Sequence, residues 1–255
     1  MQFVDYLSIL SRWTHIAAGI LWIGLLYFFN FVNGPFAGTM DGDTKKKVVP
    51  ELMPRALYWF RWGAAYTWIT GVLLIYFVFE SGNVFLANTS GGSAGSIVVL
   101  WSFILAPFIY DALAKSPLAK NPKVFTAIMF VLVVAVLWVM ETVCGFGYRG
   151  MVIYMGAMFG TTMAYNVWYR IWPSQQKIIN GVKTGNPADA SVVALAGSRS
   201  KHNTYMSVPL VWAMINSHHA PMASNCDWGI TSIFILVGWA AVMLVYKKAA
   251  KIKGF

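Results

Sequence analysis

Charged residues are scarce in this chain of 255 residues. Asp, Glu, Lys and Arg make up 11% of it, whereas hydrophobic residues make up 58% and aromatic residues 16%. Soluble domains are usually about 25% charged, so the composition excludes an ordinary soluble domain and indicates a protein that lies mostly in a membrane. No internal repeat is evident, and we expect residues 1–255 to form a single integral membrane domain.

The N-terminus lacks the features of a cleaved signal peptide. No basic segment precedes the first apolar run, and no small-residue cleavage site follows it. This run, from Tyr6 to Phe31, exceeds the about 20 apolar residues that a helix needs to cross a bilayer. We therefore expect it to be retained as a transmembrane helix.

Apolar runs separated by segments rich in Gly, Pro and Ser predict an all-α, polytopic membrane helical bundle. The sixth run is the shortest and contains Pro209, which a membrane helix tolerates. The seven predicted spans are roughly 6–33, 56–80, 96–114, 124–145, 148–171, 203–219 and 228–247.

The basic residues alternate between the predicted loops. Of the 19 Lys and Arg residues, all but Arg12, Arg61 and Arg149 lie in the loops after spans one, three and five or in the C-terminal tail. Because basic loops stay in the cytoplasm, we expect the N-terminus outside and the C-terminus inside a bacterial cytoplasmic (inner) membrane. This topology and contact with membrane lipids account for the net charge of +10, and we expect no nucleic acid partner.

The chain has only two cysteines, Cys144 and Cys226. It has no Cys-x-x-Cys-His motif, so covalent attachment of c-type haem by this chain is excluded. Both cysteines are predicted at the outer surface, in a compartment that permits a disulfide. The alternative is two unrelated membrane cysteines, because the sequence does not show whether their Cα atoms approach.

Histidines are also few, and two of the four mark a candidate haem site. His15 lies in the outer half of the first span and His218 at the outer end of the sixth, so their predicted depths match. Ionisable groups at such depths are costly and mark functional sites. Facing helices of a bundle hold cofactors, and His is a standard axial ligand of haem. We therefore predict haem b between His15 and His218.

Neighbouring residues support this site. Arg12 precedes His15 by three residues, which places it on the same helical face, where it can pair with a haem propionate. Gly19 and Gly24 have no side chain and would let a flat macrocycle lie close to the helix. The alternative is that His218 and His219 are interfacial residues and that His15 only bridges two helices.

A second polar group is predicted at the cytoplasmic side. Arg61 lies at least one turn inside the second span, where a guanidinium needs an anion such as Asp111, a haem propionate or an acidic substrate. Alternatively, Arg61 reaches a lipid phosphate. The group comprises Asn30, Asn33, Arg55, Arg61, Asn166, His202 and Asn203.

Three segments resemble the membrane domain of the bacterial membrane-bound urate oxidases (urate hydroxylases). They read RWTHIAAGILWIGLLYFFNF at 12–31, PELMPRALYWFRWG at 50–63, and SKHNTYMSVP followed by MINSH at 200–218. The resemblance spans nearly the whole chain. The residues that fall on the family's pattern are His15, Arg55, Arg61, His202, Asn203 and His218, whereas His219 does not. The first helix also resembles, more distantly, that of bacterial haem-dependent protoporphyrinogen oxidases.

The resemblance implies an enzyme of purine catabolism that oxidises urate to 5-hydroxyisourate. Arg61, His202 and Asn203 would then take the small anionic substrate as catalytic residues, and electrons would pass through the haem. Family members carry a further helix and a C-terminal cytochrome c domain, whereas this sequence ends at Lys251-Ile-Lys-Gly-Phe. We therefore expect a separate cytochrome c or the subunits of a respiratory complex as partner.

The competing interpretation is a haem-bearing or structural membrane subunit of a larger respiratory electron-transfer complex. A transporter is disfavoured, because no pair of interrupted helices occupies corresponding halves of the chain.

The predicted topology can be tested by labelling single cysteines in a background without Cys144 and Cys226. Cysteines at positions 92 and 185 are expected to react with an impermeant thiol reagent from opposite sides of the membrane. Position 92 lies in the loop after span two, which is predicted outside, and position 185 lies in the loop after span five, which is predicted inside. Labelling of both positions from one side would contradict the seven-span topology.

Overall fold

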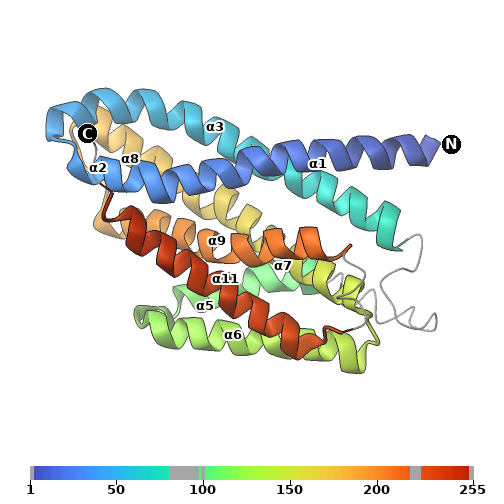
Figure 1. Cartoon of the computed structure of the whole chain (residues 1–255). Helices are drawn as coiled ribbons and strands as arrows, with labels where there is room; N and C mark the ends of the chain where they lie inside the picture. The colour runs from blue at the N-terminus through green and yellow to red at the C-terminus, as the bar shows by residue number, and fades with distance from the viewer. Residues whose placement is uncertain (1–2, 81–97, 99–100, 219–224, 253–255) are drawn as a thin grey trace. The chain divides into compact units, whose positions relative to one another are not determined.

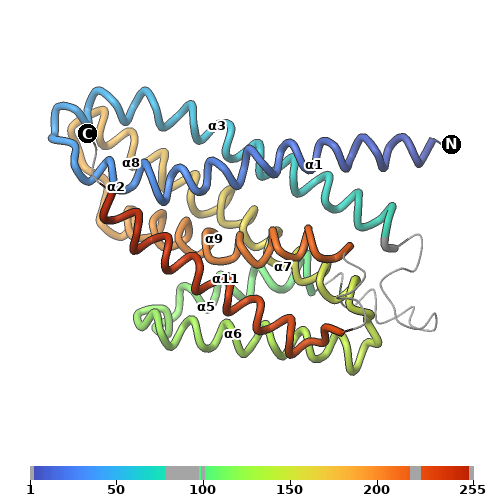
Figure 2. The backbone as a smooth tube through the Cα atoms, in the orientation of Figure 1, coloured from blue at the N-terminus to red at the C-terminus, as the bar shows by residue number. Residues whose placement is uncertain are grey.

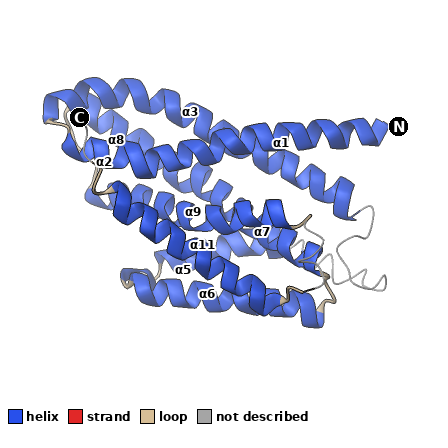
Figure 3. Ribbon diagram, in the orientation of Figure 1, coloured by secondary structure: helices blue, strands red, loops and turns tan. Residues whose placement is uncertain are grey.

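The structure is a computed structural model that describes residues 3–80, 98, 101–218 and 225–252. Every regular element in these residues is a helix, which confirms the all-α prediction (Figures 1 and 3). The chain forms two compact units. The first comprises Met1–Leu73, Met163–Ser207 and Trp239–Phe255, and the second comprises Leu74–Thr162 and Val208–Gly238.

The first helical segment passes through the position where we predicted a break. It consists of α1 (Phe3–Tyr27), the π-helical turn η1 (Phe28–Asn33) and α2 (Gly34–Thr39). Pro35 has no N–H to donate, and its ring crowds the preceding turn. The Gly34 N–H bonds to the carbonyl of Phe29, five residues back, and this wider turn accommodates the proline without ending the helix.

The next segment is α3 (Gly42–Leu74), which continues into η2 (Ile75–Glu80). Asp41 caps it: its Oδ1 accepts hydrogen bonds from the backbone N–H groups of Asp43 and Thr44, both at 2.9 Å. The prediction of a loop up to residue 55 was therefore wrong. The charged residues of this region sit on a helix that begins well before the apolar run, since polarity alone does not end a helix.

Helices α1 and α3 lie side by side in the first unit and run antiparallel (Figures 1 and 2). Gly63, Thr67 and Gly71 follow one another at intervals of four residues and so share one face of α3. A Cβ at Gly63 would lie 3.3 Å from the backbone N of Trp22. Small residues at such spacing let membrane helices pack with their backbones close together.

The remaining part of the first unit draws on α7 (Tyr148–Asn166), η6 (Val167–Ile171), α8 (Trp172–Thr184), α9 (Ala190–Asn216) and α11 (Trp228–Ala249). We predicted a long loop between residues 171 and 203, and this was wrong. Helix α8 ends at Gly185, whose φ of 76° is left-handed. Asp189 Oδ1 then accepts from the Ser191 N–H at 2.7 Å, ahead of α9.

The second unit contains η3 (Trp101–Leu105), α5 (Ala106–Lys115), η4 (Pro117–Lys120), α6 (Pro122–Trp138) and η5 (Val139–Val143). The predicted break between the third and fourth spans is confirmed, because α5 ends at Lys115 and α6 begins at Pro122. The Asn121 side chain caps α6 by accepting from the N–H groups of Lys123 and Val124, and each proline follows its cap at the start of a helix, where a missing N–H costs little.

The predicted disulfide is absent, since Cys144 and Cys226 are both free thiols. A carboxylate joins the two helix ends in its place. Glu141 of η5 accepts a hydrogen bond through Oε2 from the backbone N–H of Trp228, at 2.6 Å, where α11 begins. The contact satisfies one of the donors that the first turn of a helix leaves open.

Three helical segments are long and apolar enough, by length and composition, to cross a membrane: Phe3–Thr39, Pro122–Val143 and Trp228–Ala249. Large apolar side chains of the first of them face outward, with Trp13 73% and Ile20 71% exposed. A lipid environment accounts for such exposure. The other four spans and the orientation of the termini stay predictions.

Replacing Gly63 with Leu is expected to destabilise the protein by about 1–3 kcal/mol, because the new side chain overpacks the contact with Trp22. Reversible unfolding by SDS in mixed micelles measures this change. Gly24 is the matched control, because a Cβ there meets nothing within 4 Å. An equal loss for Gly24→Leu would show that helix packing at Gly63 is not the cause.

Candidate functional site

His15 is held between α1 and α3 by its Nδ1 atom. Nδ1 lies 2.9 Å from the carbonyl oxygen of Thr67 and 3.3 Å from Oγ1 of Thr70. A carbonyl can only accept, so the neutral ring carries its proton on Nδ1 and leaves the lone pair of Nε2 available. No described residue forms a hydrogen bond with Nε2. Histidines that bind metals are commonly oriented by such a backbone contact, and His15 therefore fits a haem ligand.

The residues around His15 differ in how well their positions suit a bound cofactor. Gly71 receives the imidazole ring, because a Cβ there would lie 3.0 Å from Cε1 of His15. A Cβ at Gly19 would lie 3.7 Å from the methyl group of Thr67, so Gly19 faces α3 and serves helix contact, whereas Gly24 faces open space. Arg12 is exposed, and no described residue pairs with its guanidinium.

His218 has different surroundings, in the second unit. It is exposed, in the turn after α9, and its Nδ1 lies 3.4 Å from a guanidinium nitrogen of Arg149. Because a guanidinium can only donate, a neutral His218 carries its proton on Nε2, the reverse of His15. The two histidines belong to different units, and their joint ligation of haem stays a prediction. His219 lies outside the described residues.

Arg61 is surrounded by aromatic rings. Its guanidinium carbon lies 4.0 Å from the ring centroid of Trp172, 5.7 Å from that of Tyr58 and 5.8 Å from that of Trp168. Cation–π attraction offsets part of the cost of placing this charge in the helices. Its buried Nε has no hydrogen-bond partner among the described residues.

Asp111 was one of the predicted anionic partners of Arg61, but in the structure it pairs with another residue. It forms an ion pair of 2.7 Å with Lys115, one turn further along α5 in the second unit. Aromatic rings, and not this carboxylate, are therefore the contacts that the structure gives Arg61.

Asn203 opens the predicted sixth span, and its neighbour His202 differs from it in role. Asn203 is buried and joins α9 to α7: its Oδ1 accepts from Asn166 at 2.8 Å, and its Nδ2 donates to the carbonyl of Met163 at 3.0 Å. His202, just ahead of that span, is half-buried. Its burial, with smaller effects of Arg199 and Lys201, lowers the pKa of His202 to about 4, so this imidazole is neutral at pH 7.

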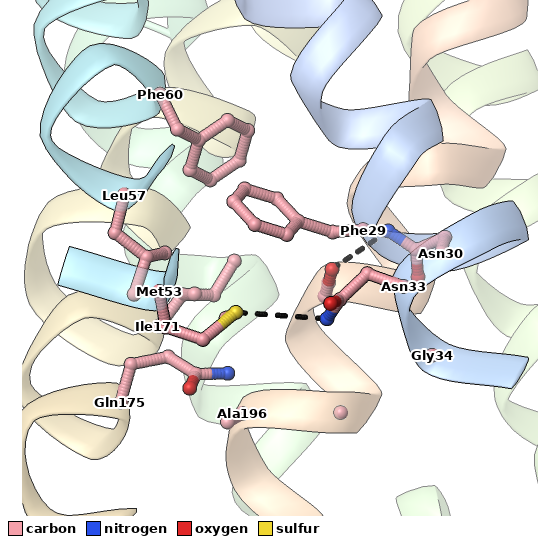
Figure 4. Close-up of a pocket in the computed structure, with 12 residues that line it drawn as sticks. Phe29, Asn30, Asn33, Gly34, Met53, Leu57, Phe60, Ile171, Gln175 and Ala196 are labelled. Carbon is pink, nitrogen blue, oxygen red and sulfur yellow. Dashed lines mark hydrogen bonds between the residues drawn. The ribbon is translucent and has the colours of Figure 1, made fainter. Parts of the chain in front are cut away.

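The first unit contains a cavity of about 240 Å³ (Figure 4). Arg61, His202 and Asn203 are not among its lining residues. Four helical segments form its wall, and the sequence predicted the two asparagines but missed Gln175 and Ser200, which fell in the supposed loop. The lining residues are Phe29, Asn30, Asn33, Gly34, Met53, Leu57, Phe60, Ile171, Gln175, Ala196, Gly197 and Ser200.

The amide groups of this cavity differ in how far they are already used. Asn30 donates to the carbonyl of Leu26 and to Oγ of Ser200, and accepts from the hydroxyl of Tyr246, at 2.8–2.9 Å. Asn33 has only a long contact, 3.6 Å, from Nδ2 to the sulfur of Met53. Gln175 forms no hydrogen bond with a described residue. Asn30 therefore has a structural role, whereas the side-chain amides of Asn33 and Gln175 remain available for hydrogen bonds to a ligand.

Residues 36–253 match the family described as urate oxidase N-terminal. The match covers most of the chain. The chain belongs to the urate oxidase N-terminal family. The matched segment includes Arg61, Gln175, His202 and His218, whereas α1 with Arg12 and His15 precedes it. No curated protein and no solved structure matches the chain.

The contact between Arg61 and Trp172 is expected to contribute a coupling energy of about 0.5–2 kcal/mol to stability. A double-mutant cycle with Arg61→Met and Trp172→Leu measures it. Arg55 provides the control, because it is exposed and pairs with Glu51 of its own helix. A coupling between Arg61 and Trp172 no larger than that between Arg55 and Trp172 would contradict the cation–π assignment.

Proposed function

We propose that this chain is the membrane part of a urate-oxidising enzyme of purine catabolism. The observation that carries the proposal is the match of residues 36–253 to the urate oxidase N-terminal family. The reaction converts urate to 5-hydroxyisourate; water supplies the added oxygen, and the electrons and protons released must leave the site. A haem b held by this chain would supply the electron acceptor, and a separate cytochrome c or the subunits of a respiratory complex would be the partner that takes the electrons on.

In this proposal the chain crosses a bacterial cytoplasmic membrane as seven spans, with the N-terminus outside. Support comes from the three long apolar segments and from outward-facing side chains such as Trp13 and Ile20. The alternation of basic residues between loops supports the orientation. The inner ends of the spans then face the cytoplasm, where purine breakdown supplies urate.

His15 is the residue best suited to hold the haem. Its Nδ1 contact with Thr67 fixes the ring and the tautomer, and Gly71 gives the ring room. When bound, haem b accepts and releases electrons one at a time. His218 is the second proposed ligand, and Arg12, exposed and three residues before His15, is the proposed partner of a propionate.

Arg61, His202 and Asn203 are the proposed residues for substrate. The aromatic rings hold the guanidinium of Arg61 while its Nε stays without a described partner, so an anion can bind to its edge. His202 stays neutral at pH 7 because burial lowers its pKa to about 4, so it can hydrogen-bond to the substrate without adding a charge. Asn203 positions α9 through its bonds to α7.

The haem assignment is tested by reduced-minus-oxidised spectra of the purified protein. His15→Ala and His218→Ala are each expected to remove or strongly alter a low-spin haem b spectrum, because each removes one of the two proposed ligands. His219→Ala is the control and is expected to leave the spectrum unchanged. A wild-type spectrum in the His15 variant would contradict the assignment.

The same spectra separate an enzyme from an electron-transfer subunit. Arg61→Ala is expected to keep the haem but to weaken urate-dependent haem reduction by about tenfold to a hundredfold, the effect of losing a charge-assisted hydrogen bond. Loss of haem in this variant would mean that Arg61 holds the cofactor. If urate does not reduce the haem of the wild-type protein, the chain is a respiratory subunit and the proposed reaction is wrong.

A further inference from the structure

We propose that the cavity of the first unit is a binding site for the cyclic amide edge of a flat heterocycle, with Gln175 and Asn33 as the residues that recognise it. The identity of the ring as that of urate rests on the proposed function. The site itself rests on the cavity, its free amide groups and its apolar walls, none of which includes Arg61, His202 or Asn203.

The hydrogen-bonding groups fit a cyclic amide. The side-chain amides of Gln175 and Asn33 point into the cavity from opposite sides (Figure 4). Each carries a donor and an acceptor next to one another, which is the pattern that adjacent C=O and N–H groups of a ring present in reverse. Gln175 forms no hydrogen bond with a described residue, and Asn33 has only its long contact with Met53.

A third group adds a donor. The Oγ atom of Ser200 accepts from Asn30, and its own hydrogen has no acceptor among the described residues. It can therefore donate to a ligand carbonyl. Asn30, tied to Leu26, Ser200 and Tyr246, holds this hydroxyl in place and is not itself part of the recognition.

The other walls favour a flat ring, because they present apolar surfaces to its faces. Phe29 and Phe60 meet edge to face with their centroids 5.3 Å apart (Figure 4), and Leu57 and Ile171 complete the apolar lining. Small-molecule sites combine such surfaces with a few placed polar groups. The lining contains no charged side chain, so the part of the ligand that enters is uncharged, because burying an unpaired charge is costly.

Direct binding to the purified full chain in nanodiscs tests this site, by equilibrium dialysis against urate, xanthine and unsubstituted purine. Xanthine carries cyclic amide groups, whereas purine has the same rings without carbonyls. Urate and xanthine are expected to bind at least about tenfold more tightly than purine, since purine leaves the amides of the site unpaired.

Two pairs of variants locate the site. Gln175→Met and Asn33→Leu are each expected to weaken binding of urate and xanthine about tenfold, because each replaces a side-chain amide with an apolar side chain of similar size. The controls are Gln176→Met and Asn180→Leu, because both residues are exposed and neither lines the cavity. Unfolding temperatures equal to wild type show that the variants are folded.

The outcomes separate the site from the proposed function. Unchanged binding in both cavity variants while urate still reduces the haem would overturn the site and leave the function intact. Weakened xanthine binding in those variants, without any oxidation of urate, would support the site and overturn the function. A tightly held lipid that neither heterocycle displaces, with no binding of either, would overturn the site.

Discussion

The close contact between α1 and α3 is the constraint on which the first unit depends. Gly63 lets the backbone of α3 approach Trp22, and Gly71 receives the ring of His15. Because the helices are so close, the Nδ1 of His15 can reach the carbonyl of Thr67 at 2.9 Å. In water the hydrophobic effect would hold such a pair, whereas in lipid it is van der Waals packing and hydrogen bonds that do so. The histidine that is proposed to bind haem is thus oriented by packing of the backbone.

The same pair of helices also shapes the cavity, through its other residues. Met53, Leu57 and Phe60 are spaced along one face of α3, and they line one wall. Another wall belongs to η1, the wide turn that accommodates Pro35, which supplies Phe29, Asn30 and Asn33 to the lining. Wide turns of this kind occur often at functional sites, and here the turn itself carries amides and an aromatic ring of the cavity lining.

The sequence predicted what hydrophobic periodicity reports and missed what depends on distant contacts. Apolar runs predicted the helices, and the break between the third and fourth spans was predicted correctly because local turn chemistry determines it. The loop predictions were wrong because a helix can include charged residues outside the apolar region, as the segment capped by Asp41 shows. Gln175 was missed for this reason, although Ile171 and Gln175 are four residues apart and share a face once η6 and α8 are continuous. The disulfide prediction was wrong, because the positions of the two cysteines in the sequence do not show which contact joins the helix ends. In the structure Glu141 joins them, and both cysteines are free thiols.

The aromatic partners of Arg61 also could not be predicted from the sequence. They affect how the results of Arg61 variants are interpreted. Rings at Trp168 and Trp172 surround the guanidinium, and no local pattern connects them with a residue so far away in the chain. Phe60 and Ile171 line the cavity, and the next residue of each helix, Arg61 or Trp172, forms the cation–π contact. This contact therefore fixes α8 against α3 at the level of the cavity wall, and Gln175 lies one turn further along α8. Loss of the Arg61 charge then acts in two ways: it removes a group that can bind an anion, and it frees the helix that carries Gln175. Replacement of Trp172 weakens the contact between the helices but keeps the charge of Arg61, so a larger loss of binding in the Arg61 variant is expected if the guanidinium also binds an anion.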